Sequence, residues 1–128
     1  MSVDAVALVR EAYEAWNRDG PRAMLPYASA ELQLQDPPQM PDGRTWEGCD
    51  AVLARLEEVA GAVGGRWVDL REMRLAGDEV FVAMAWRIDS SPDSAVLGDV
   101  FHLVRVRGGK LDRIRVFVTE ADALETVD

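Results

Sequence analysis

The sequence predicts a single α+β domain in which three N-terminal helices cover one face of a curved antiparallel sheet. Up to Gly65 the apolar residues recur mainly at helical spacing, and beyond it they alternate in four runs separated by turn residues. The chain has 128 residues, of which 48% are hydrophobic, which suffices for one core but not for two. We therefore expect one domain over residues 1–128.

Four segments are expected before Gly65. They are helices over residues 3–18 and 21–28, a strand over residues 32–36, and a third helix over residues 52–63. The first helix has an apolar side made of Val6, Val9, Tyr13 and Trp16. Pro21 fits the first turn of the second helix, because a proline there lacks only an N–H that would be unpaired anyway. Glycines end the first and third helices, and Asp36 with the prolines after it ends the strand.

Four strands joined by hairpins are expected after Gly65. Their boundaries are residues 66–75, 79–89, 95–107 and 111–119. Side chains two residues apart share a face, and one face is apolar enough to lie under the helices, with His102 as its one ionisable member. The opposite face holds four arginines and all three phenylalanines, which are Arg105, Arg107, Arg113, Arg115, Phe81, Phe101 and Phe117. In a monomer these rings would contact water, so we expect a homodimer through this face.

Composition excludes several classes of partner. The formal charge is -9, from 23 acidic and 14 basic residues, so a phosphate backbone or an anionic membrane surface would be repelled. Apolar runs never reach the roughly 18 to 20 residues that cross a bilayer, and the N-terminus lacks the features of a signal peptide, so a cytoplasmic location is expected. One cysteine and one histidine provide neither a disulfide nor a structural zinc site. We interpret the cysteine, Cys49, as a packed residue near a helix start, and we expect no cofactor.

Two segments carry a resemblance to a known family. LQDPPQMPDGRTWEG, residues 34–48, ends a strand on Asp-Pro before a helix start, and VFHLVRVRGGKLDRIRVFV, residues 100–118, is a hairpin with a Gly-Lys turn. With the order of elements, they resemble the NTF2-like superfamily and, within it, the SnoaL-like and ketosteroid-isomerase-like proteins. The resemblance implies a cone-shaped sheet around a pocket, closed by the three helices at its wide end, and often a homodimer through the outer sheet face.

The resemblance also implies roles for single residues. Asp36 stands where the isomerases of this family have a general base beside a carbonyl. In those isomerases a tyrosine and a protonated aspartate stabilise the oxyanion. The place of the tyrosine falls on Ala12, with Tyr13 one step around the helix, and the place of the aspartate falls on His102, where SnoaL-like polyketide cyclases commonly have an acid. The reaction is therefore left open between isomerisation, cyclisation and hydration.

Asp36 and His102 are the candidate catalytic residues. A carboxylate before proline is also a common turn residue, so a role as base requires an apolar wall around it, since burial favours the protonated form. His102 is either a donor to a ligand oxygen or acid–base partner of Asp36, or a buried histidine that bonds a backbone carbonyl.

Aromatic, methionine and valine side chains are expected to line a pocket for a small hydrophobic molecule. The candidates are Trp16, Met40, Trp46, Val82, Met84, Trp86, Val104 and Val116. Its rim is expected at the proline-rich loop over residues 37–44. Together with the resemblance, these residues predict a SnoaL-like protein that binds a hydrophobic carbonyl compound and isomerises, cyclises or hydrates it without a cofactor. The alternative is a non-catalytic ligand-binding or accessory module, and a cavity of roughly 300 Å³ lined by both candidate catalytic residues would favour a ligand site.

Overall fold

The computed structural model describes residues 4–39, 44–63, 67–91 and 93–127. Its elements are α1 (Ala5–Asp19), the 3-10 helix η1 (Pro21–Tyr27), β1 (Ala28–Gln35), β2 (Thr45–Glu47), α2 (Cys49–Val63), β3 (Trp67–Ala76), β4 (Glu79–Arg87), β5 (Val96–Arg107), β6 (Lys110–Phe117) and α3 (Glu120–Thr126). The predicted α+β class is confirmed. Two elements, β2 and α3, were not predicted, and the second helix is a 3-10 helix that contains Pro26.

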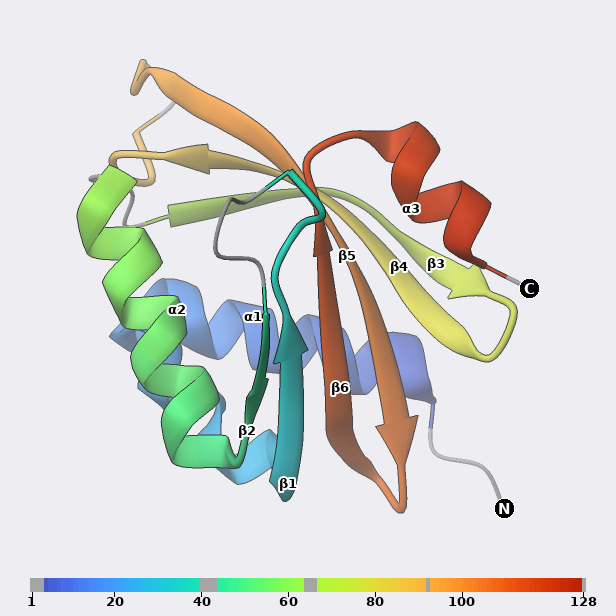
Figure 1. Cartoon of the computed structure of the whole chain (residues 1–128). Helices are drawn as coiled ribbons and strands as arrows, with labels where there is room; N and C mark the ends of the chain where they lie inside the picture. Colours follow the sequence, from blue (N-terminus) through green and yellow to red (C-terminus); the bar gives the residue numbers. More distant parts are fainter. Residues whose placement is uncertain (1–3, 40–43, 64–66, 92, 128) are drawn as a thin grey trace.

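The strands form one curved sheet in the order β2-β1-β6-β5-β4-β3 (Figure 1). All neighbouring pairs are antiparallel except β1 and β6, which run parallel, so the sheet is mixed rather than wholly antiparallel. The register shifts between Leu70 and Glu72 and between Trp86 and Arg87. Such bulges bend a strand and increase its local twist, which contributes to the curvature of the sheet.

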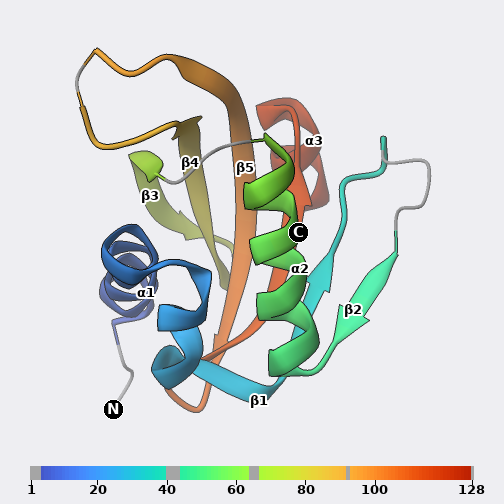
Figure 2. The ribbon, with the colours of Figure 1, turned by 90° about the vertical axis from the view of Figure 1, so that its left-hand side faces the viewer.

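Helices α1, η1 and α2 lie on the concave side of the sheet (Figures 1 and 2). α1 begins at Asp4, whose side chain accepts a hydrogen bond from the Ala7 N–H at 3.2 Å, and it ends at Gly20, whose φ of 92° suits glycine. The Asn17 side chain exchanges two hydrogen bonds with the backbone of Val68, at 2.8 and 2.9 Å. These bonds hold α1 against β3 and thereby fix where its buried side chains point.

The main core lies between these helices and the concave face. Apolar residues from every layer meet there, including Trp16 from α1, Leu34 from β1, Leu56 from α2 and Met84 from β4. Most residues that β4, β5 and β6 contribute are those that alternation assigned to the face under the helices, and Leu111 is an exception beside the register shift between Arg105 and Val106. The predicted division of the sheet into two faces therefore agrees with the structure.

The opposite face differs from the sequence prediction, because α3 covers it (Figure 2). Phe81 and Phe117 are buried there with Leu103 and with Ala123 of α3, and only Phe101 keeps partial exposure. The premise that three aromatic rings would contact water in a monomer is therefore wrong. Thr119 caps α3 by accepting a hydrogen bond from the Asp122 N–H at 3.2 Å.

Candidate functional site

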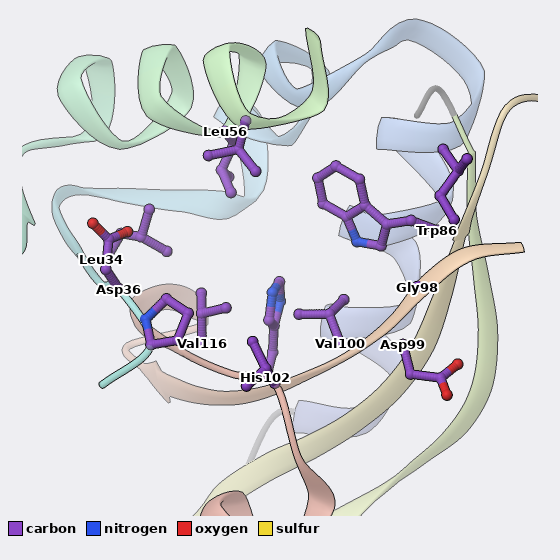
Figure 3. Close-up of a pocket in the computed structure, with 13 residues that line it drawn as sticks. Leu34, Asp36, Leu56, Trp86, Gly98, Asp99, Val100, His102 and Val116 are labelled. Carbon is purple, nitrogen blue, oxygen red and sulfur yellow. The ribbon is translucent and has the colours of Figure 1, made fainter. Parts of the chain in front are cut away.

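A cavity of about 240 Å³ opens on the concave side of the sheet between β1, α2 and the strands β4 to β6 (Figure 3). Its lining residues are Leu34, Asp36, Pro37, Leu56, Val59, Trp86, Leu97, Gly98, Asp99, Val100, His102, Val116 and Val118. Leu97 and Val118 are exposed, so the cavity meets solvent where β5 begins and β6 ends. Its volume is somewhat below the roughly 300 Å³ set as the criterion for a ligand site, and both candidate catalytic residues line it.

Asp36 follows the last residue of β1 and is held by two side chains. Its Oδ2 atom accepts hydrogen bonds from the Trp46 indole N–H at 3.2 Å and from Arg55 Nη2 at 3.3 Å. Pairing of β1 with β2 sets Trp46 beside this strand end, and Arg55 reaches it from α2. Among the described residues no donor bonds the other oxygen, Oδ1. Asp36 is thus an oriented carboxylate with one acceptor oxygen available, rather than a carboxyl surrounded only by apolar groups.

His102 projects from β5 into the cavity (Figure 3), and a hydrogen bond joins it to Tyr13 of α1. The Tyr13 hydroxyl lies 2.6 Å from His102 Nδ1, and both side chains are buried. Burial lowers the pKa of His102 from 6.5 to about 3 and raises the pKa of Tyr13 above its usual range. Both groups are therefore neutral at pH 7.

The hydrogen bond between these two groups also fixes which imidazole nitrogen carries the proton. No described residue other than His102 bonds the Tyr13 hydroxyl, and a buried O–H without an acceptor is costly. We therefore assign the hydroxyl as donor to Nδ1, which leaves the proton on Nε2. His102 then presents a neutral N–H donor to the cavity.

The lining of the cavity carries little net charge. Of the residues that line it, only Asp36, Asp99 and His102 are ionisable, and His102 is held neutral. Asp36 pairs with Arg55, and Asp99 lies at the exposed edge, 3.5 Å from Arg71. A lining of this kind suits a neutral ligand.

Four of the predicted pocket residues lie elsewhere in the core. Val82, Met84 and Val104 do point to the concave side, but they pack into the main core and do not line the described cavity. Trp16 packs edge-on against Trp86 at a ring distance of 5.8 Å, also behind the cavity wall. These positions differ from the prediction because alternation gives the face of a side chain and not its distance from the covering helix α1.

The remaining predicted residues lie at different places relative to the cavity. Trp86 and Val116 line the cavity, whereas Trp46 contacts Asp36 from outside it. Met40 and most of the predicted rim loop lie outside the described residues, and Pro37 lines the cavity. Cys49 is buried at the start of α2, and burial is the main cause that raises the pKa of its thiol.

Sequence reasoning missed Tyr13 and Arg55 as parts of the site. The helical stripe places Tyr13 on the buried side of α1, but nothing in the spacing identifies His102 as its partner. Nothing in the sequence marked Arg55 as part of the site, because a single arginine in a helix is usually solvated.

Within the described part of the chain, no group of three His, Cys, Asp or Glu side chains is arranged to hold a metal ion. No helix that the structure describes is both long and apolar enough for a membrane span.

Comparison with known proteins places this architecture among described families. Residues 9–114 match the profile of the SnoaL-like domain family. No curated protein sequence matches the chain. An NTF2-like protein from Burkholderia pseudomallei superposes with a TM-score of 0.70 at 20% identity and covers 98% of both chains.

Two further solved structures have related descriptions. TerC, crystallised with polyporic acid, gives a TM-score of 0.71 at 20% identity over 94% of this chain and 95% of TerC. A candidate isomerase of the SnoaL-like family from Agrobacterium tumefaciens gives 0.68 at 18% identity over 90% of this chain and 97% of its own. At sequence identities of 18 to 20%, this structural similarity establishes the fold and not the activity.

Proposed function

Because this chain belongs to the SnoaL-like family, we propose that its cavity binds a small, neutral, mainly apolar carbonyl compound on which Asp36 and His102 act together. The observation that carries the proposal is that an oriented carboxylate and a neutral N–H donor line one apolar cavity. An empty cavity of about 150 Å³ in a protein core binds benzene, so 240 Å³ suits a molecule of about two fused rings.

The proposed chemistry is a proton transfer beside the carbonyl. Asp36 Oδ1 takes a proton from the carbon next to the carbonyl carbon, and the electron pair of that C–H bond moves into the enolate. The enolate oxygen accepts a hydrogen bond from His102 Nε2–H, which stays protonated throughout. Return of the proton from Asp36 to another carbon completes an isomerisation. In a cyclisation the enolate carbon instead attacks a second carbonyl carbon, and the oxygen of that carbonyl takes the proton from Asp36. A positioned base of this kind typically contributes about 10²- to 10⁴-fold in rate.

A second candidate function is ligand binding without turnover. The contacts of Asp36 favour it, because Arg55 and Trp46 both donate hydrogen bonds to its carboxylate, as they would in a structural ion pair. TerC is a relative crystallised with an organic acid, and the Agrobacterium protein is a candidate isomerase, so the structural relatives support both functions.

Deuterium exchange separates the two functions without knowledge of the natural substrate. The probe is 2-tetralone, a bicyclic ketone with acidic protons beside its carbonyl, followed by NMR in D₂O with and without the protein. We expect exchange above the buffer rate, and we expect Asp36→Asn to remove that excess while leaving the fold intact. Asp99→Asn is the matched control, because Asp99 also lines the cavity but lies at its exposed edge. Exchange that persists in Asp36→Asn removes Asp36 from the mechanism, and binding without exchange by the unmodified protein supports the binding function.

We also propose that the protein is cytoplasmic and forms a homodimer through the outer sheet face. The dimer now depends on the partly exposed Phe101 and the arginines beside it, since α3 covers Phe81 and Phe117. Sedimentation at micromolar concentration tests it, with Phe101→Asp expected to give monomers. A monomeric mass for the unmodified protein contradicts it.

A further inference from the structure

Trp86 carries a polar atom that the fold leaves without a partner. The side chain lines the cavity and is only 8% exposed, and its indole Nε1 is buried with no hydrogen-bond acceptor among the described residues. Buried tryptophan N–H groups usually have a partner, because an unpaired one is costly. The other indole at this site, that of Trp46, donates to Asp36.

The unpaired N–H faces the space that His102 also faces. Figure 3 shows the nitrogen on the edge of the indole ring that is turned toward Val100 and His102. On the neighbouring strand Trp86 pairs with Gly98, which has no side chain to fill the space in front of the ring. Nε1 itself is covered, so contact with a ligand atom requires the indole to tilt into the cavity.

The strand register separates the two donors. His102 lies four residues beyond Gly98 along β5, which is about 13 Å between their Cα atoms at 3.3 Å per residue. Side chains that lean toward each other shorten the distance between the two N–H groups, but their backbone positions stay four residues apart along β5. Two donors from separate strand positions in one apolar cavity match a ligand with two acceptor oxygens.

We propose that Trp86 Nε1–H is a second hydrogen-bond donor to the ligand, and that the ligand carries a second acceptor oxygen at the end opposite the carbonyl held by His102. This inference rests on the proposed function and names the substrate class within it: a neutral, roughly bicyclic ketone with a remote second oxygen. Trp86 then determines specificity and takes no part in the proton transfer.

A matched pair of probes tests the second donor. In 6-methoxy-2-tetralone the remote substituent has an oxygen, and in 6-ethyl-2-tetralone a CH₂ group of similar size replaces it. We expect the methoxy compound to bind about 2- to 10-fold more tightly to the unmodified protein, which is the range for one net hydrogen bond. This preference is expected to disappear in Trp86→Phe. It should persist in Trp16→Phe, because Trp16 packs against Trp86 without lining the cavity.

Indole N–H signals give a second measurement that requires no folded variant of Trp86. The protein has four tryptophans, and the Trp86 signal is expected to move on addition of the methoxy probe and to move less with the ethyl probe. Equal affinities for both probes, or a preference that survives Trp86→Phe, overturn the inference while the proposed function stands if both ketones bind. Failure of both ketones to bind overturns the inference and the proposed function together.

Discussion

Replacing Tyr13 by Phe removes one oxygen atom from behind the cavity and tests how His102 is held. The hydroxyl donates to His102 Nδ1 at 2.6 Å in a fully buried environment, so the variant leaves a ring nitrogen unpaired in the core. Leaving a buried polar group without its partner costs about 1 to 3 kcal/mol. For a chain of this size the loss corresponds to a fall in Tm of roughly 3 to 10 °C. We therefore expect a folded protein of lower stability whose His102 no longer keeps its proton on Nε2 alone.

Urea denaturation measures the stability change, and long-range ¹H–¹⁵N spectra of the imidazole measure the tautomer. His102 is the single histidine, so its signals need no assignment by difference. Tyr27→Phe is the matched control, because Tyr27 lies on η1 and is only partly buried. A Tyr13→Phe variant as stable as the control, with the Nε2–H tautomer unchanged, would refute the assignment of Tyr13 as the donor that orients His102.

Three further predictions concern the filling of the cavity, the effect of pH, and the ion pair. Gly98→Val is expected to reduce binding of 2-tetralone at least tenfold, because Gly98 lines the cavity and the new side chain fills part of it. Little stability should be lost, because a Cβ at this position meets no atom within 4 Å. Calorimetry measures the binding and urea denaturation the stability. Burial lowers the pKa of His102 to about 3, so the folded protein keeps this imidazole neutral. The stability that depends on the neutral form is fully present above about pH 6.5 and is lost toward pH 3, at up to about 1.4 kcal/mol per pH unit. An imidazole NMR signal that titrates near pH 6.5 contradicts this. Arg55→Gln is expected to cost about 2 to 4 kcal/mol, because it leaves the buried carboxylate of Asp36 without its cation, whereas Arg71→Gln, which breaks an exposed pair, should cost less than about 1 kcal/mol in the same denaturation assay.

The sequence predicted the fold class and the two faces of the sheet, because both depend on periodicity. It did not predict α3, whose seven residues are too few to form a stable helix alone and are held by the packing of Ala123 against the outer face. That single omission made Phe81 and Phe117 seem exposed and produced the argument for a dimer. Tertiary contact decided the burial of these rings, and no local pattern in the sequence records such a contact.

For the site, the sequence predicted that Asp36 and His102 face the interior, and the structure adds what surrounds them. Alternation cannot say that α1 covers Val82 and Met84 while the space beside Val100 stays open. It also cannot bring Arg55 to Asp36, since that contact joins a helix to a strand end across the core. The chemistry of the cavity depends on these long-range contacts more than on the residues that the sequence identifies.

The contact between Arg55 and Asp36 bears on the proposed role of Asp36 as a base. Proton transfer to Asp36 moves a negative charge from beside Arg55 to the enolate oxygen near His102. Arg55 contacts Asp36 Oδ2 at 3.3 Å, so its attraction for the ionised carboxylate opposes this movement of charge. A hydrogen bond from His102 to the enolate oxygen offsets part of that opposition. The cavity is therefore suited to compounds whose protons are already acidic, and for a simple ketone Arg55→Gln should exchange deuterium faster than the unmodified protein despite its lower stability. Slower exchange in that variant, with 2-tetralone still bound, would mean that Arg55 orients the base more than it weakens it.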